Sequence, residues 1–241
     1  MKDTDANVKG YAYSADALNE LEATLSVDRF ATYLAATGAD REAAARLYTW
    51  NTAICAAFYG PLQALEIAVR NGMHRQLAKT YGVDWYDNPA AGLNHGANGK
   101  VAQARTELQR DGYPLDPPHI IASLSFGFWV SLLGKGGFVD RARTQRANYE
   151  MTLWRPALRA AFPHAASLNR AGAHTPLDFL RTFRNRIAHH EPIFHRHLQQ
   201  DYQNILTVMS WTCPHKQSWM QAHCRVPELL ALPPGDPAVR F

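Results

Sequence analysis

One stretch decides the fold class: LDFLRTFRNRIAHHEP, residues 177–192. Its apolar residues recur at three- and four-residue spacing, which is the period of an amphipathic helix: Leu177, Leu180, Phe183 and Ile187. Thr175 before Pro176 is typical of an N-cap followed by the first helical position, so the pattern predicts a helix from Thr175 to about His190. Pro192 disfavours helical geometry at the preceding residue and so predicts the end of this helix.

The same helical period covers most of the chain. Ser26 predicts the N-cap of a helix over 27–36 that Gly38 ends, and Asp40 predicts the cap of the next helix. Further helical stretches are predicted over 41–59, 62–81, 100–111, 120–133, 154–162 and 193–211, with Gly60-Pro61 as a break or kink between the first two. No stretch alternates convincingly as a β-strand does, and 138–150 is expected to be an exposed connection or a short helix. The sequence predicts an all-α fold in a single domain.

The composition agrees with a folded, soluble protein. The chain has 241 residues, of which 46% are hydrophobic and 19% charged, enough to bury a core. Three scattered cysteines indicate a reducing compartment, and we expect a cytoplasmic protein without a signal peptide or membrane span, because no uninterrupted apolar run is long enough. The net charge of +4 is mild, but 19 of the 25 cations are Arg, the residue suited to bidentate phosphate contacts.

Polar residues gather at the end of the helix predicted from Thr175. Asn185 and His189 are four residues apart and share one face, next to Arg184, while Arg186 and His190 form a second such pair. The partial negative charge of a helix C-terminus favours the imidazolium form of histidine. The cluster therefore places a proton-transfer group beside a fixed cation.

This pairing suits cleavage of an RNA phosphodiester. RNA supplies its own nucleophile, the 2′-hydroxyl, and a His can act as general acid or base near neutral pH. An Arg can hold the non-bridging oxygens and stabilise the charge that develops in the transition state. The expected products are a 2′,3′-cyclic phosphate and a 5′-hydroxyl, with no metal or other cofactor, and DNA cannot react this way. One Arg-His pair supplies only part of such a site, so a homodimer is expected to supply the rest.

Structural roles compete with this interpretation. Histidines at a helix end can simply form local hydrogen bonds. Glu66 and Arg70 have the spacing of an ordinary helical ion pair; the alternative places Arg70 and Asn71 in an RNA groove or beside Arg184. Trp129 and Trp154 are predicted to lie in the core.

Two further groups have open alternatives. Cys213, His215, His223 and Cys224 are ligand types that zinc prefers, but their spacing fits no common zinc-finger pattern, so no metal site is predicted. His195 and His197 are expected on a solvated face. The arginines within 141–146 either follow an RNA backbone or belong to a solvated connection.

Residues 184–192 resemble the Arg-x4–6-His motif of the HEPN superfamily, and more narrowly the RNxxAHHEP signature of its Abi-like branch. Segments within 61–71, 81–86, 124–129 and 153–156 resemble the same family in the same order. The resemblance spans roughly residues 26–232 and implies a HEPN-type helical bundle with additional helices. Residues 1–25 would then form an N-terminal extension and residues 233–241 a C-terminal tail.

The resemblance also implies a function. Such proteins dimerise to build a composite ribonuclease site, and Arg184 and His189 match its two catalytic positions. Asn185 matches the polar residue that often follows the Arg, and His190 is expected to support the pair. Arg186, together with Arg70 and Asn71, is expected to bind RNA.

The branch is associated with bacterial abortive infection and toxin-antitoxin defence, so we expect a toxin with RNA, and an antitoxin or small RNA, as partners. Some members only bind RNA, and a non-catalytic module that holds a small structured RNA is the alternative; a scaffold for protein assembly is a third. HEPN toxins of one type carry a Tyr shortly after the His, which a partner enzyme modifies. Residues 190–194 contain no Tyr, so that form of silencing is not expected here.

Overall fold

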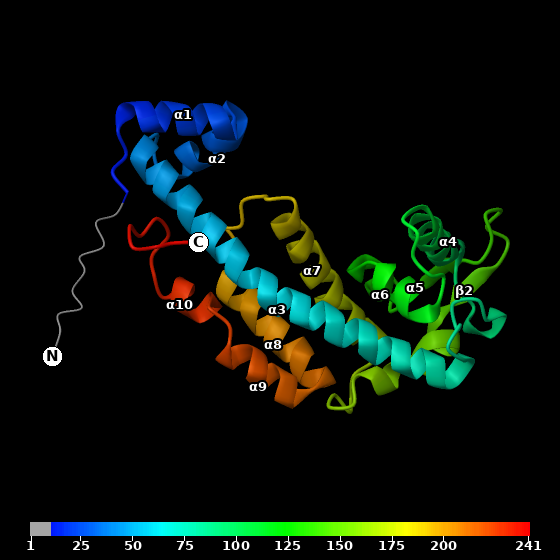
Figure 1. The fold of residues 1–241 in the computed structure, drawn as a ribbon. Helices are drawn as coiled ribbons and strands as arrows, with labels where there is room; N and C mark the ends of the chain where they lie inside the picture. The colour runs from blue at the N-terminus through cyan, green and yellow to red at the C-terminus, as the bar shows by residue number, and fades with distance from the viewer. Residues whose placement is uncertain (1–10) are drawn as a thin grey trace. The chain divides into compact units, whose positions relative to one another are not determined.

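The computed structural model describes residues 11–241, most of which are helical (Figure 1). This confirms the all-α class. The chain forms two compact units: a first unit of residues 186–199, 224–241 and the described part of 1–60, and a second unit of residues 61–185 and 200–223. Because the units alternate along the chain, no single cut separates them, in keeping with one domain and not two consecutive ones.

The first unit begins with α1 (Ala15–Leu25) and α2 (Val27–Ala36), and contains the start of α3 (Arg41–Tyr81) and, near the C-terminus, α10 (Val226–Leu230). Ser26 caps α2 by accepting a hydrogen bond from the Arg29 backbone N–H at 3.4 Å, as the sequence predicts. Helix α1 contributes to the core of this unit. That core contains Leu18, Phe30, Tyr33, Ala44 and Leu47. Within the predicted extension over 1–25, the first ten residues lie outside the described part, and α1 occupies most of the remainder.

The second unit contains the remainder of α3 and most of the shorter elements. In chain order these are η1 (Pro89–Ala91), α4 (His95–Arg110), α5 (Pro117–Ser123), α6 (Phe126–Ser131), β1 (Gly136–Phe138), β2 (Arg146–Asn148), η2 (Glu150–Trp154), η3 (Leu158–Ala161), α7 (Arg170–Ala188), α8 (Leu198–Thr212) and α9 (Pro214–Ala222), with α7 and α8 each extending across a unit boundary. Its core is aromatic: Trp85 packs against Phe128 and Trp129, with ring centroids 6.3 and 5.8 Å away. Trp129 and Trp154 are buried, as predicted.

Local caps move several helix boundaries from their predicted places. Asn94 caps α4 by accepting from the Ala97 N–H at 2.7 Å, so α4 begins at His95, earlier than predicted. The predicted helix over 120–133 is divided into α5 and α6, because Ser125 caps the second of them. The predicted helix over 154–162 is instead a π-helical turn, η2, followed by a 3₁₀ turn, η3.

Helix α3 continues through Pro61, where the sequence predicts a break or kink. Proline removes one helical N–H donor, which weakens an isolated helix. The flanking side chains Phe58 and Leu62 are almost fully buried, and this burial offsets the lost hydrogen bond. The predicted break at Pro61 is therefore wrong, because packing around the proline keeps the helix continuous.

Helix α3 is also long and apolar enough to cross a membrane, with a mean hydropathy of 1.3 in one 18-residue window. Of that window, 44% is buried inside the protein. A core helix of a soluble protein meets the same criterion, so this single helix is weak evidence for a span. The lack of a membrane span, and the cytoplasmic location, stay expectations from the sequence.

The segment expected to be a connection or a short helix forms an antiparallel β-hairpin. Strands β1 and β2 pair Gly136 with Asn148 and Phe138 with Arg146. Gly136 has a φ of +105°, and a Cβ there would lie 2.7 Å from the Ala147 carbonyl oxygen, so this position requires glycine. Three-residue strands are too short to leave an alternating pattern in the sequence.

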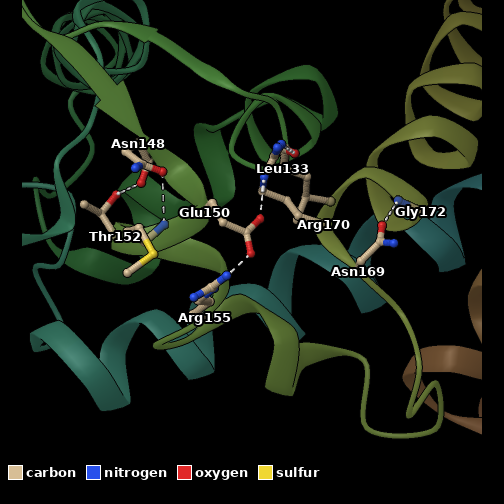
Figure 2. A network of polar contacts seen from close by, with 9 residues as sticks. Leu133, Asn148, Glu150, Thr152, Arg155, Asn169, Arg170 and Gly172 are labelled. Carbon is tan, nitrogen blue, oxygen red and sulfur yellow. Dashed lines mark hydrogen bonds and ion pairs between the residues drawn. The ribbon is translucent and has the colours of Figure 1, made fainter.

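Helix α7 begins at Arg170, five residues before the predicted start, and contains Pro176 in its interior. Asn169 caps it, its Oδ1 accepting from the Gly172 N–H at 2.7 Å. Figure 2 shows how the first turn is held: Arg170 Nε lies 3.1 Å from a Glu150 carboxylate oxygen and its Nη1 donates to the Leu133 carbonyl at 2.7 Å. These contacts fix the helix that carries Arg184.

Candidate functional site

Arg184 lies near the C-terminal end of α7, in the second unit. The buried stripe of this helix, Leu177, Leu180 and Phe183, is fully inaccessible, which turns the adjacent Arg184 toward partly exposed positions. Its Nε lies 3.5 Å from an oxygen of Glu66, and the two side chains are 37% and 22% exposed. The guanidinium is thus held by a carboxylate yet keeps access to solvent.

Glu66 was not among the predicted site residues, and its predicted pairing with Arg70 is wrong. Glu66 pairs with Arg184, while Arg70 Nε donates to the Asn71 side-chain oxygen at 3.2 Å. The four-residue spacing in the sequence marks a possible helical pair, whereas the actual partner comes from a helix more than a hundred residues away. Arg70 still shares a face of α3 with Glu66, because the two are one turn apart.

Asn71 lies on a different side of α3 from Glu66. It lines a cavity of about 300 Å³ within the second unit, together with Gly72, Arg75 and Lys216. Residues 66 and 71 are five apart, which places their side chains well separated around a helix. Arg70 and Asn71 were predicted to act together in RNA binding, and the structure places only Arg70 on the face that carries the contact with Arg184.

His189 and His190 lie in the exposed turn that follows α7, in the first unit. The sequence predicts the helix to about His190, but it ends at Ala188 in a Schellman motif. The His190 N–H donates to the Ile187 carbonyl at 3.0 Å, and the Glu191 N–H to the Arg186 carbonyl at 2.9 Å. His190 takes the left-handed conformation that this motif requires, with a φ of +57°. Glycine usually occupies that position.

Arg186 does not pair with His190 as predicted, because His190 has left the helix. Its Nη1 lies 3.5 Å from a Glu191 carboxylate oxygen. This ion pair spans the Schellman turn. Asn185, the remaining predicted residue, is half-buried in the last helical turns. The unit boundary falls between it and Arg186, so Arg184 and Asn185 belong to the second unit and the histidines to the first.

Two residues that sequence reasoning missed hold the histidine turn. Arg29 Nη1, on α2, donates to the His190 carbonyl at 2.7 Å. Asn51, on α3, is only 4% exposed, and its Oδ1 accepts from the Ile193 N–H at 2.8 Å and from the Phe194 N–H at 3.2 Å. Backbone groups of residues 190, 193 and 194 are therefore all fixed by side chains from other helices of the first unit.

Helix α8 starts at Leu198, later than the predicted Ile193. The backbone N–H groups of Ile193 and Phe194 bind Asn51, so residues 193–197 form an anchored loop. Ile193 is fully buried, and the Phe194 ring lies 5.3 Å from that of Tyr33. Burial raises the pKa of the Tyr33 hydroxyl, so this aromatic support stays neutral. No local pattern in the sequence signals these distant partners.

Two of the four residues weighed as zinc ligands, Cys213 and His223, have local structural contacts. Cys213 caps α9, its Sγ accepting from the Lys216 N–H at 3.4 Å, and the His223 ring contacts the Trp219 carbonyl at 2.8 Å. Among residues 11–241, no three His, Cys, Asp or Glu side chains form a group that could hold a metal ion.

Comparison with protein-family models, curated proteins and solved structures gave no match to this chain. The resemblance of residues 184–192 to the HEPN motif therefore stays an expectation from the sequence. The structure adds two local features at this motif. Glu66 forms an ion pair with the motif arginine, and Arg29 and Asn51 hold the backbone of the turn that contains the histidines.

Proposed function

We propose that this protein is a metal-independent endoribonuclease of the HEPN type, which acts as a toxin in bacterial abortive infection or toxin-antitoxin defence. The nonapeptide at 184–192 carries the proposal, because it combines the Arg and His of that motif at the motif's spacing. The clamp on residues 190–194 supports it. An exposed histidine on an anchored backbone is suited to proton transfer, which requires a fixed position relative to the substrate.

In this proposal His189 serves as general acid or base for the 2′-hydroxyl or the leaving oxygen. Arg184 stabilises the charge on the non-bridging phosphate oxygens. The closest contact of Glu66 is to Arg184 Nε, and a guanidinium has further donors on its two Nη atoms that can reach a phosphate. Asn185 and His190 support the pair, and Arg70 and Arg186 contact the RNA, whereas Asn71 faces another side of α3.

A second copy of the chain completes the site in this proposal. One Arg-His pair provides one acid-base group, whereas cleavage through the 2′-hydroxyl uses a base to activate the nucleophile and an acid to protonate the leaving group. A homodimer would place two such pairs in one cleft. RNA is the substrate, and an antitoxin or a small RNA is the partner that holds the enzyme inactive in the cytoplasm.

A non-catalytic RNA-binding module is the second candidate. One observation favours it: both arginines of the motif form ion pairs with carboxylates, Arg184 with Glu66 and Arg186 with Glu191. Such pairing reduces the positive potential available to a transition state. This candidate predicts salt-dependent RNA binding without cleavage.

The two candidates are separated by RNA cleavage in EDTA with Arg184→Ala and His189→Ala. The nuclease proposal expects each variant to lose at least about a hundredfold in rate, because an acid-base group or a charge-stabilising donor typically contributes that much. Arg225→Ala and His215→Ala make the same chemical changes at exposed positions outside the motif and should cleave like the wild type. Circular dichroism checks that all four variants are folded. Cleavage that persists in both motif variants rejects the assignment, and binding without cleavage by the wild type favours the second candidate.

A further inference from the structure

The β-hairpin of the second unit carries most of the chain's excess positive charge. Residues 135–148 contain four cations, Lys135, Arg141, Arg143 and Arg146, and one acid, Asp140, which gives a net charge of +3. The whole chain has a net charge of +4, so the other 227 residues contribute only +1 between them. The mild total therefore conceals a local concentration of charge.

The four cations of the hairpin are exposed, and none of them forms an ion pair with another residue in the described part of the chain. The motif at the end of α7 differs, since Arg184 and Arg186 both have carboxylate partners. In Figure 1 the loop between β1 and β2 extends beyond the helices that surround its base in the second unit. Its charges are available to a partner.

Asp140 does not neutralise these cations by pairing with them. Its carboxylate accepts hydrogen bonds from the Thr144 N–H at 3.1 and 3.2 Å, from the Thr144 hydroxyl at 2.8 Å and from the Gln145 N–H at 2.9 Å. These bonds hold the pKa of Asp140 at about 2. The acid is used to shape the loop that carries Arg141 and Arg143.

Phe138 arranges two of the arginines. The guanidinium carbon of Arg146 lies 4.9 Å from the centre of its ring and that of Arg143 5.8 Å. Phe138 and Arg146 are also directly paired across the two strands. Cation–π contact restricts these flexible side chains while leaving their N–H donors free, which favours recognition of phosphate by a pre-arranged guanidinium.

The base of the hairpin is anchored in the second unit. Ala147 is 8% exposed and Tyr149 is fully buried, and the Tyr149 hydroxyl accepts from the Asn94 backbone N–H at 2.9 Å. The Asn94 side chain also donates to the Gly136 carbonyl. An exposed and highly charged loop thus stands on a fixed support.

Arg143 adopts the left-handed backbone conformation, with a φ of +59°. Glycine or asparagine takes this conformation with less strain, so the backbone of the turn does not by itself favour arginine here. This gives a way to separate binding from folding, since glycine at this position removes the charge and suits the backbone.

We propose that this hairpin is a binding site for the phosphate backbone of RNA, which it recognises by charge and not by base sequence. The inference rests on the proposed function in one respect, namely that RNA is the ligand. Arg141, Arg143 and Arg146 contact phosphates through their guanidinium groups, and Phe138 keeps two of them in place. The hairpin captures RNA and leaves the chemistry to Arg184 and His189.

The test is RNA binding as a function of salt, measured by fluorescence anisotropy with a labelled single-stranded RNA. The triple variant Arg141→Gln, Arg143→Gln and Arg146→Gln should bind at least about tenfold more weakly at low salt. The slope of log K against log salt should become shallower by about 0.7 for each phosphate of a single strand that the variant no longer neutralises. The matched control changes Lys79, Lys100 and Arg110 to Gln, which removes the same charge from exposed positions outside the hairpin. An equal loss of affinity in both triple variants would overturn the proposal, as would hairpin-dependent binding to anionic vesicles with none to RNA.

The single variant Arg143→Gly provides a second test of the hairpin site. It should weaken RNA binding without lowering the melting temperature, because glycine suits the local backbone. Unchanged affinity in this variant and in the triple variant would reject the hairpin site even if the protein binds RNA elsewhere.

Failure of the hairpin proposal can be distinguished from failure of the nuclease proposal. His189→Ala should lose cleavage and keep the wild-type salt slope. Arg184→Ala should lose cleavage with a slope that is shallower by no more than the one phosphate that Arg184 contacts. The hairpin triple variant should raise KM with kcat unchanged. A protein that binds RNA through the hairpin and cleaves nothing would retain this inference and lose the nuclease assignment.

Discussion

The end of helix α7 and the β-hairpin are both rich in arginine, but they use it in opposite ways. At the end of α7, Arg184 and Arg186 are each paired with a carboxylate, Glu66 and Glu191. On the hairpin, the arginines have no carboxylate partner in the part of the chain that the structure describes, and its one acid is occupied by loop hydrogen bonds. Paired charges fix a geometry, whereas unpaired charges attract a polyanion.

The comparison shows why composition is a poor guide to where uncompensated positive charge lies. The densest cluster of Arg and His in the sequence is largely compensated in three dimensions. The hairpin looks like an ordinary connection in the sequence, yet it carries most of the net charge. Four predictions test this contrast, in order of decreasing expected effect.

The first concerns the clamp on the histidine turn. Asn51→Ala removes the acceptor for two backbone N–H groups, one of them fully buried, and should lower the free energy of unfolding by about 2–3 kcal/mol. Asn71→Ala is the matched control on the same helix, at an exposed position, and should change it by less than about 0.5 kcal/mol. Urea unfolding measures both. Similar values for the two variants would show that the turn is not held by Asn51.

The second prediction concerns the neutralisation of the Arg184 charge by Glu66. Glu66→Gln should raise RNA affinity several-fold, because it leaves the charge of Arg184 without its carboxylate. The free energy of unfolding should change by less than about 1 kcal/mol, as expected for a partly exposed ion pair. Glu228→Gln removes the same charge from an exposed carboxylate outside the motif and controls for net charge. If both variants bind RNA equally well, the pairing of Arg184 has no special role.

The third concerns the Schellman turn. His190→Gly should raise the free energy of unfolding by up to about 1 kcal/mol, because glycine adopts the left-handed conformation with less strain. His190→Ala retains the strain and should leave stability close to that of the wild type. Thermal unfolding distinguishes the two variants. A clear loss of stability in His190→Gly would mean that the imidazole itself supports the turn.

The fourth concerns pH and the hairpin loop. The folded pKa of Asp140 is about 2, below the usual value of 3.8, so its carboxylate stabilises the loop above pH 3.8. That contribution should be lost as the pH falls toward 2. The amide NMR signals of Thr144 and Gln145 should shift with a midpoint near 2, while those of Ile193 and Phe194, held by a non-titrating asparagine, should not follow it. A midpoint near 3.8 would show that the carboxylate does not hold the loop.

Local patterns predicted local structure well. The apolar stripe of α7 is buried as its spacing predicts, and Ser26 caps α2 at the predicted residue. The chemistry of a cap or an amphipathic face depends on residues within a few positions, and the sequence contains all of that information. The all-α class follows from the sum of such signals.

The partners of the candidate site could not be predicted in the same way. Asn51 is 142 residues from Ile193, and nothing in its neighbours distinguishes it from Asn71. Glu66 has a possible helical partner in Arg70, four residues away, yet it pairs with Arg184. The hairpin has strands of three residues, too short for a period to be visible. These features depend on tertiary packing, which no window of sequence contains.

The central claim is that Arg184 and His189 cleave RNA through its own 2′-hydroxyl. The most direct measurement maps the ends of RNA fragments formed in EDTA by the wild type and by His189→Ala, with a parallel substrate that is 2′-deoxy at the cleaved nucleotide. We expect 2′,3′-cyclic phosphate and 5′-hydroxyl ends from the wild type, no product from the variant and no cleavage at the deoxy position. Cleavage at the deoxy position, or unchanged cleavage by the variant, would contradict the account.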